Sequence, residues 1–347
     1  FPARKLTVIG ITGTKGKSSV AEMLYAILTE AGHTTALAST IHFVIGEKVR
    51  PNLFKMTLPG RGFIQKFLAE ARAKNCTHAV VEITSEAALQ YRHLGLALDA
   101  LIFTNLQREH IESHGSLENY FRTKFAIGTA LACSPKRPRI IIANADDARG
   151  ADFLALPVEK QVSFSLGDAS DARADEQGVS FSYGGTDFTL PLPGRFNILN
   201  ALAAIRASEA LGVPLGVCAK ALEELGTING RVERINAGQD FLAVVDYAHT
   251  PDSLRALYSA FPHQRKICVL GNTGGGRDTW KRPEMGRIAD EACEKVILTN
   301  EDPYDEDPRA IVEPVAHGMK RAPGIIMGRR EAIRAALRAA RAGDVVL

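Results

Sequence analysis

One stretch near the N-terminus indicates the fold of the chain: Val8-Ile9-Gly10-Ile11-Thr12-Gly13-Thr14-Lys15-Gly16-Lys17-Ser18-Ser19. An apolar, β-type run leads through a glycine-rich turn into a helix-like segment that begins at Val20. This order is typical of phosphate-binding loops, in which backbone N–H groups and the helix N-terminus attract anionic oxygens. In such a loop Lys17 is expected to reach the β- and γ-phosphates, and the Ser18 hydroxyl to bind Mg²⁺.

The spacing of this loop leaves a second interpretation open. In a strict phosphate-binding loop, four residues separate a first glycine from the Gly-Lys pair that follows it. This chain has Ile11 at the position of that first glycine. Taken alone, the loop is also compatible with an ordinary glycine turn of an α/β protein.

The composition predicts a globular protein with two or three domains. The 347 residues are 46% hydrophobic and 23% charged, with a formal net charge of +3. This charge is too small to indicate a nucleic-acid partner, and no apolar run reaches the ~20 residues of a membrane helix. With no signal peptide, we expect a cytoplasmic, monomeric protein that acts on small molecules. The chain lacks an initiator Met and ends in an apolar run, so we expect a fragment of a longer protein.

The cysteines indicate neither a zinc site nor a disulfide framework, because no Cys-x-x-Cys pair occurs. We expect each to be a small buried hydrophobic side chain in a reducing compartment. The five cysteines are Cys76, Cys133, Cys218, Cys268 and Cys293.

Strand and helix patterns alternate along the chain, which predicts a parallel sheet wrapped by helices. Between residues 161 and 192 short β-type segments with glycine turns predict a small antiparallel subsheet. The strands expected in this part are 34–38, 78–83, 100–104, 139–143, 162–164, 179–185 and 188–190. The helices expected are 63–74, 117–133, 197–211 and 215–225.

A domain boundary is expected within residues 226–234, which divides the chain into 1–228 and 229–347. The second part repeats the alternation and predicts a Rossmann-like α/β domain. Its expected strands are 241–246, 266–270 and 295–299, and its expected helices are 252–261, 283–292, 308–320 and 329–340.

Two strand ends carry candidate ligands for a cation. Glu82 ends one strand, where the side chains of an open α/β sheet face the ligand crevice, so it is a candidate Mg²⁺ ligand opposite Ser18. A helix-capping role for Glu82 is the alternative. The strand ending at Thr104 leads into a segment with two His and two Glu within residues 109–114. These residue types are compatible with zinc or with Mg²⁺ beside phosphates.

Several segments, in order, resemble motifs of the Mur ligase family. The loop at 12–18 resembles that family's TGTxGK(T/S) loop, including the unusual spacing at Ile11. Others resemble its EVSS, TN…DHLDxHG, GxFNxxNxLAA and GRxE motifs, at residues 82–85, 104–115, 194–201 and 230–233. Segments 245–252, 275–283 and 300–308 resemble the MurE branch, the UDP-N-acetylmuramoyl-tripeptide synthetases.

The resemblance implies ATP-driven amide formation through an acyl phosphate, in peptidoglycan precursor synthesis. It implies a P-loop-type parallel-sheet ATPase domain, followed by the Rossmann-like domain. The implied ATP-binding residues are Thr12, Gly13, Thr14, Lys15, Gly16, Lys17, Ser18, Asn197, Asn200, Arg231 and Asp246. Two Mg²⁺ ions would be held by Ser18, Glu82, His110 and a carbamylated Lys124, which would otherwise be a surface helix lysine. The implied catalytic residues are Lys17, Lys124, His110 and Arg231.

The resemblance also implies two substrate sites. A muramoyl-dipeptide acceptor would be held by Thr57, Ser85, Gln90 and Arg92, and the incoming amino acid by Arg277, Glu301, Asp302 and Tyr304. Tyr304 stands where diaminopimelate-adding members have an arginine. Without the paired N–H donors of a guanidinium, a second carboxylate on the amino acid is poorly held. Glu301 and Asp302 replace Asp-Asn and add negative charge, which favours L-lysine or a similar diamine.

Other departures from the family pattern are Leu58, Glu86 and Glu109, where the family has Thr, His and Asp. The family's N-terminal uridine-nucleotide domain and its C-terminal GKGHE segment have no counterpart in the sequence. Two alternatives therefore stay open. One is a related ligase with a nucleotide-free or lipid-linked acceptor, and the other is a nucleotide-binding scaffold without ligase activity.

Overall fold

The computed structural model describes residues 1–54, 56–109 and 111–347. Its N-terminal part is built on an eight-stranded sheet in the order β4-β3-β2-β5-β1-β6-β7-β8. The strands are β1 (Thr7–Thr12), β2 (Thr35–Ala38), β3 (His42–Ile45), β4 (Lys48–Pro51), β5 (His78–Glu82), β6 (Ala100–Phe103), β7 (Ile140–Asn144) and β8 (Lys160–Phe164). Neighbouring strands from β2 to β8 run parallel, whereas β3 and β4 add an antiparallel edge.

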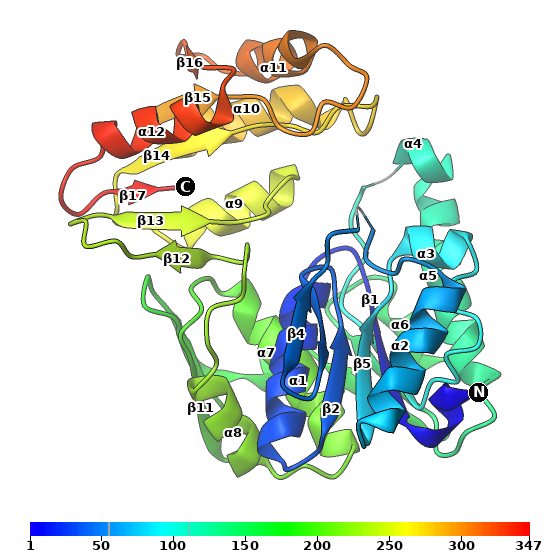
Figure 1. The fold of residues 1–347 in the computed structure, drawn as a ribbon. Helices are drawn as coiled ribbons and strands as arrows, with labels where there is room; N and C mark the ends of the chain where they lie inside the picture. The colour runs from blue at the N-terminus through cyan, green and yellow to red at the C-terminus, as the bar shows by residue number, and fades with distance from the viewer. Residues whose placement is uncertain (55, 110) are drawn as a thin grey trace.

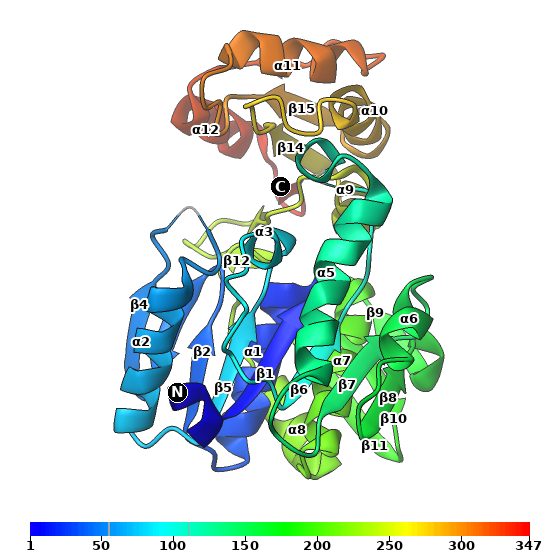
Figure 2. The same cartoon turned by 90° about the vertical axis from the view of Figure 1, so that its right-hand side faces the viewer.

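Helices cover both faces of this sheet, because alternate residues of each buried strand point to opposite sides. In β5, for example, Val80 joins one apolar cluster while Ala79 and Val81 join the other. Figure 1 shows the sheet nearly edge-on between the two helical layers. One layer is formed by α1 (Lys17–Glu30), α7 (Phe196–Ala210) and α8 (Leu215–Glu223). The other, in front in Figure 2, contains α2 (Arg61–Ala73), α3 (Ser85–Leu89), α5 (Leu117–Ala132) and α6 (Gly150–Leu154).

A small antiparallel sheet lies beside this domain, in the order β11-β10-β9. Its strands are β9 (Ser170–Ala174), β10 (Val179–Tyr183) and β11 (Thr186–Leu190). The antiparallel assignment of residues 162–164 is wrong, because they belong to β8, which pairs in parallel with β7. As an edge strand, β8 buries only alternate side chains, and this gives it the sequence pattern of an antiparallel strand.

The C-terminal part has its own six-stranded sheet, in the order β12-β13-β17-β14-β15-β16. The strands are β12 (Glu233–Ile235), β13 (Leu242–Val245), β14 (Lys266–Leu270), β15 (Lys295–Leu298), β16 (Gly324–Ile325) and β17 (Val345–Val346). The helices are α9 (Pro251–Ser259), α10 (Lys281–Ala292), α11 (Pro308–His317) and α12 (Arg329–Ala339). The short apolar β17 pairs in parallel with both β13 and β14, so it lies inside the sheet.

The fold class predicted from the sequence is confirmed, and the helices predicted in both parts lie within three residues of their expected bounds. The sequence did not predict β3, β4, β9, β12, β16 or β17. The division at residues 228/229 stays a prediction.

In the described part of the chain, no helix combines the length and apolar character needed to cross a membrane.

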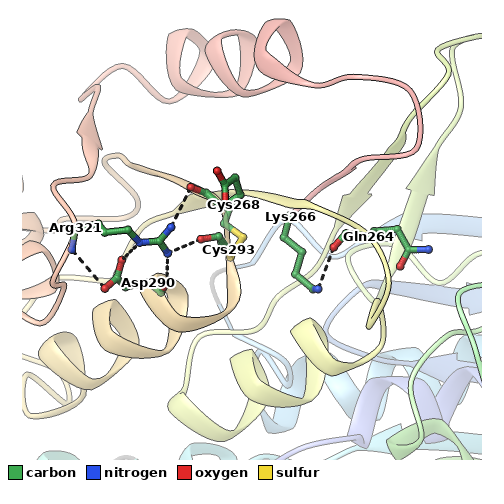
Figure 3. The surroundings of a disulfide bond; sticks show 7 residues. Gln264, Lys266, Cys268, Asp290, Cys293 and Arg321 are labelled. Carbon is green, nitrogen blue, oxygen red and sulfur yellow. Dashed lines mark hydrogen bonds and ion pairs between the residues drawn. A yellow bond between two sulfur atoms is a disulfide. The ribbon is translucent and has the colours of Figure 1, made fainter.

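Two of the cysteines are joined, so the expectation of isolated cysteines is wrong for this pair. A disulfide connects Cys268 of β14 with Cys293 at the end of α10 (Figure 3). The cause is the fold: α10 follows β14 and packs back on the sheet, which brings the two Cα atoms within 6.3 Å. A separation of 25 residues carries no sign of this proximity. Cys76 and Cys218 are buried as expected, whereas Cys133 is exposed.

The contact between α10 and α11 depends on Gly286. A Cβ built on Gly286 would overlap the backbone oxygen of Val315 in α11, so an alanine requires the two helices to separate. We expect Gly286→Ala to lower the free energy of unfolding by about 1–3 kcal/mol, as overpacking does. Urea unfolding followed by circular dichroism measures this change.

The matched control is Gly216→Ala in α8, where an added Cβ meets no atom within 4 Å. Because alanine favours helix, this variant is expected to be as stable as the wild type or more stable by up to about 1 kcal/mol. Equal stability of the two variants would contradict the packing argument.

Candidate active site

The turn between β1 and α1 has a backbone that requires glycine at two positions. Gly13 and Gly16 have φ values of 145° and 83°, in the region that side chains disfavour. A Cβ on Gly13 would overlap the Thr104 hydroxyl, and one on Gly16 would overlap the side chain of Asn200. The turn is therefore shaped by its conformation and by close neighbours, and Gly16 directly precedes the first turn of α1.

The end of the neighbouring strand β6 holds this turn in place. Asn105 accepts a hydrogen bond from Thr14 N at its backbone oxygen (2.8 Å) and from Lys15 N at Oδ1 (2.9 Å). The Thr104 hydroxyl donates to the oxygen of Lys15 at 2.7 Å. The loop after β6 and the turn after β1 therefore form one connected unit.

Three residues that are far apart in the sequence meet at the start of α1. Ser18 Oγ donates to Glu82 Oε2 at 3.1 Å, and Thr40 N donates to the same carboxylate oxygen at 2.8 Å. Arg231 reaches across from the C-terminal part, and its guanidinium donates to Ser18 Oγ at 3.2 Å. Glu82 is only 2% exposed. The structure thus brings together Ser18, Glu82 and Arg231, whose roles as metal ligands and phosphate contact stay predictions.

Two lysines direct their amines at the turn. Lys17 Nζ donates to the oxygen of Thr14 (2.9 Å), and Lys124 Nζ donates to that of Gly13 (2.7 Å). Burial lowers the pKa of Lys17, and burial together with the positive charge of Lys17 lowers the pKa of Lys124 well below its usual value. Lys124 is 1% exposed, so it is not a surface helix lysine. Both ammonium groups would be stabilised by an anion at the turn.

The candidate residues for the adenosine moiety lie next to the same turn or in the C-terminal part. Asn197 and Asn200 are buried in the first turns of α7, and the Asn200 amide donates to Asn197 Oδ1 at 3.0 Å. The Asp246 carboxylate accepts from Val232 N at 2.8 Å, and burial raises its pKa. Asn200 therefore faces Gly16, while Asp246 is tied to the segment that follows Arg231.

The candidate acceptor residues extend from the Glu82 cluster. Thr57 and Thr40 share a hydroxyl–hydroxyl hydrogen bond of 2.7 Å, which connects Thr57 to the residue that binds Glu82. Arg92 donates to the oxygen of Leu58 at 2.9 Å and also contacts the side chain of Gln90. Ser85 is the first residue of α3.

The candidate amino-acid residues group in the C-terminal part. The Arg277 guanidinium lies over the ring of Tyr304, 4.8 Å from its centroid. The oxygen of Asp302 accepts from Gly274 N at 2.9 Å, and the Glu301 side chain packs against Gly271. These contacts connect the loop after β14 with the loop after β15.

The oxygen groups at the start of α1 fit Mg²⁺. This ion prefers one or two carboxylates, hydroxyls and substrate phosphates to a dedicated protein cage, and Ser18 with Glu82 is such a set. No group of three or more His, Cys, Asp or Glu side chains in residues 1–54, 56–109 and 111–347 is arranged to hold a metal ion. His110, predicted as a metal ligand, lies outside the described residues.

No pattern in the sequence assigns a role to Tyr120 or to His249. Tyr120 contacts Thr14 through its hydroxyl (3.2 Å), and its ring lies 4.6 Å from Lys124 Nζ. Its position four residues before Lys124 on α5 could have revealed this, because such residues share a helix face. His249, from the C-terminal part, lies 2.5 Å from Glu109 Oε1 and 3.2 Å from Lys15 Nζ. Only its place within the segment 245–252 marked it in the sequence.

Comparisons with known proteins identify the family of the chain. The model of the Mur ligase middle domain matches residues 11–208, and that of the Mur ligase glutamate ligase domain matches residues 230–347. A UDP-N-acetylmuramyl-tripeptide synthetase of Roseiflexus sp. (strain RS-1) is 37% identical over all of this chain and 74% of its own length. A protein of Gloeobacter violaceus named as a 2,6-diaminopimelate ligase is also 37% identical, over all of this chain and 72% of its own length.

Solved structures share the fold. A UDP-N-acetylmuramoyl-L-alanyl-D-glutamate–2,6-diaminopimelate ligase matches 98% of this chain and 72% of its own, with a TM-score of 0.67 and 29% identity. A folylpolyglutamate synthase of Mycobacterium tuberculosis, complexed with ADP, matches 99% of this chain and 87% of its own with a TM-score of 0.76. At 18% identity the second likeness concerns the fold alone. With both family models matched and whole-chain relatives at 37% identity, this chain belongs to the Mur ligase family of ATP-dependent, ADP-forming amide ligases.

Proposed function

We propose that the chain adds an amino acid, L-lysine or a similar diamine, to a UDP-N-acetylmuramoyl-dipeptide in peptidoglycan precursor synthesis. The observation that carries this proposal is the meeting of Ser18, Glu82 and Arg231 beside the glycine-rich turn. It places a carboxylate, a hydroxyl and a permanent cation where a helix N-terminus would bind phosphates. The names of the Roseiflexus and Gloeobacter relatives support the same class of acceptor.

The proposed reaction has two steps. A carboxylate oxygen of the acceptor attacks the γ-phosphorus of ATP, which gives an acyl phosphate and ADP. The amine of the amino acid then attacks the acyl carbon, and inorganic phosphate leaves with the oxygen that attacked. Lys17 and Arg231 would balance the charge that develops on the phosphoryl oxygens in the first step. Two Mg²⁺ ions, at Ser18 with Glu82 and at His110 with Lys124, would add Lewis-acid stabilisation when bound.

Lys124 is proposed to act as a carbamate. Only a neutral amine reacts with CO₂, and burial beside Lys17 holds the pKa of Lys124 low, so the neutral form is favoured. Carbamylation would turn a buried cation into an anion with two oxygens. Its neighbours Lys17 and Lys15, which now disfavour the ammonium form, would then stabilise the charge.

The amino-acid preference is proposed from the C-terminal group. Arg277 would hold the α-carboxylate, while Glu301 and Asp302 would attract a side-chain ammonium. Tyr304, 47% exposed and in contact with Arg277, offers no bidentate partner for a second carboxylate. The relatives named as diaminopimelate ligases make diaminopimelate the competing substrate.

The acceptor is proposed to contact the group formed by Thr57, Ser85, Gln90 and Arg92. Thr57 is connected to Glu82 through Thr40, so an acceptor carboxylate near Thr57 would lie on the metal-binding side of the turn. A panel of nucleotide-bearing, nucleotide-free and lipid-linked acceptors distinguishes this proposal from the related ligases.

Replacing Lys17 tests the phosphate site. We expect Lys17→Ala to lower amino-acid-dependent phosphate release by about 100-fold or more, the usual loss when one charge-stabilising group is removed. Lys66→Ala, an exposed lysine on α2, is the control and should release phosphate at the wild-type rate. Wild-type turnover by Lys17→Ala would refute the assignment of the loop.

Replacing Lys124 tests the carbamate. We expect Lys124→Ala to be inactive and to regain part of its phosphate release when acetate or another short carboxylate is added, because the additive can enter the vacated space. The same additive given to Lys17→Ala should restore nothing. Full activity of Lys124→Ala without additive would remove this residue from the mechanism.

Replacing Tyr304 tests the amino-acid preference. Tyr304→Arg introduces a guanidinium fork, so we expect kcat/KM for diaminopimelate to rise relative to that for lysine, by about tenfold or more for a bidentate pair. Tyr304→Phe keeps the ring and should leave the ratio unchanged. An unchanged ratio in Tyr304→Arg would show that Tyr304 does not select the substrate.

A further inference from the structure

The loop after β6 is hydrogen-bonded to the turn between β1 and α1, called the nucleotide turn below. The same loop also contacts the C-terminal part at two places. Glu109 Oε1 lies 2.5 Å from His249 Nε2 and 3.1 Å from Lys15 Nζ. One residue earlier, the Arg108 guanidinium lies 4.5 Å from the ring centroid of Trp280. His249 directly precedes the helix cap of α9, and Trp280 directly precedes α10.

We propose that Arg108 and Glu109 form an interdomain latch, in which His249 and Trp280 are positioning residues that hold the C-terminal part against the nucleotide turn. The inference rests on the proposed function for its catalytic consequence only. The latch itself is a physical contact that can be measured without any substrate.

The carboxylate of Glu109 is shielded from water, whereas its partners Lys15 and His249 are partly exposed. Glu109 is 3% exposed, and the three side chains Lys15, Glu109 and His249 lie within hydrogen-bond distance of one another. Charged hydrogen bonds in such surroundings are worth more than surface ion pairs. Breaking the Glu109–His249 contact leaves a nearly buried carboxylate with one partner fewer, which disfavours that arrangement of the two parts.

The hydrogen bonding of the loop to the turn makes this contact a positioning device. Gln107 N donates to Thr14 Oγ1 at 3.0 Å, two residues before Glu109. A cavity of about 240 Å³ beside these contacts is lined from both parts by residues that include Thr14, Arg108, Thr250 and Trp280. Because His249 and Trp280 precede two different helices, α9 and α10, the two contacts fix an orientation and not merely a point of attachment.

The latch residues are neighbours of the proposed substrate-binding residues. His249 follows the proposed ribose-binding residue Asp246 by three positions, and Trp280 follows the proposed carboxylate-binding residue Arg277 by three. Holding His249 and Trp280 therefore sets where Asp246 and Arg277 lie relative to the nucleotide turn. The length of Glu109 matters, because an aspartate would withdraw the carboxylate by about 1.5 Å, one C–C bond.

The single tryptophan of the chain reports on the latch directly. We expect His249→Ala, without ligands, to shift the emission of Trp280 to longer wavelength, to increase its quenching by acrylamide and to enlarge the radius of gyration measured by X-ray scattering. The control His317→Ala removes a histidine at the exposed end of α11 and should change none of the three. Unchanged emission, quenching and radius of gyration in His249→Ala would overturn the latch.

A second variant approaches the contact from the other side. Glu109→Asp keeps the charge and should reproduce the changes of His249→Ala. In the double variant Glu109→Asp/His249→Ala, the emission shift, the quenching and the radius of gyration should change no more than in either single variant, because both substitutions remove the same contact. Changes in the double variant that equal the sum of those in the single variants would show that the two residues act separately and would overturn the proposal. A normal far-UV circular dichroism spectrum confirms that each variant is folded.

The catalytic consequence has its own readout. Because the amino acid proposed to bind in the C-terminal part must reach the acyl phosphate at the turn, we expect His249→Ala to lower kcat by about 10- to 100-fold, the cost of a small misplacement of reacting groups. The KM for ATP should change by less than the kcat, since the phosphate-binding turn itself is intact. A wild-type kcat in an opened His249→Ala would overturn the positioning role. If the wild-type chain shows no ligase turnover, the proposed function fails, whereas the fluorescence and scattering results still decide the latch.

Discussion

The site depends on one constraint, the hydrogen bonding of the glycine-rich turn to the end of β6. Asn105 accepts from the backbone N–H groups of Thr14 and Lys15, and the Thr104 hydroxyl donates to Lys15 O. The sheet order β5-β1-β6 explains why these partners are available, since the carboxyl ends of both neighbouring strands flank the turn. On the other side, β5 delivers Glu82 to Ser18. The topology of three strands thus assembles the proposed phosphate and metal site.

The sequence predicted the elements that carry a strong period or a long apolar run. Strands β5, β6 and β14 and helices α5 and α7 lie where their patterns placed them, because burial on one or both faces dictates those patterns. The two-residue β17 has no such signal, and its identity as a central strand depends entirely on its partners β13 and β14. The assignment of 162–164 was wrong for a related reason, since an edge strand of a parallel sheet alternates like an antiparallel one.

Side-chain relations across long separations were predictable only through motifs. The pairing of Glu82 with Ser18 followed from the strand end at which Glu82 lies, whereas the approach of Arg231 followed only from the resemblance. No motif predicted the disulfide between Cys268 and Cys293 or the contact of His249 with Glu109. Each depends on how a helix or a whole sheet is placed. The burial of Lys124 likewise reflects the packing of α5 beside the turn and not the composition of that helix.

The fold alone does not decide the substrate. A folylpolyglutamate synthase with 18% identity shares the architecture over almost the whole chain, so the acceptor and the amino acid must be argued from particular side chains. The residues proposed to make that choice lie in the C-terminal loops around Arg277 and Tyr304, whereas the proposed phosphate chemistry lies at the turn after β1. Bringing the two together requires the sheets to be held in a defined orientation.

In the proposed reaction, an acceptor carboxylate is phosphorylated at the turn between β1 and α1. The most direct measurement follows an oxygen atom from a UDP-N-acetylmuramoyl-dipeptide labelled with ¹⁸O in its reacting carboxylate, turned over with ATP and the amino acid. We expect one ¹⁸O atom in each inorganic phosphate released, since the attacking oxygen leaves with the phosphoryl group. Released phosphate without ¹⁸O would contradict it.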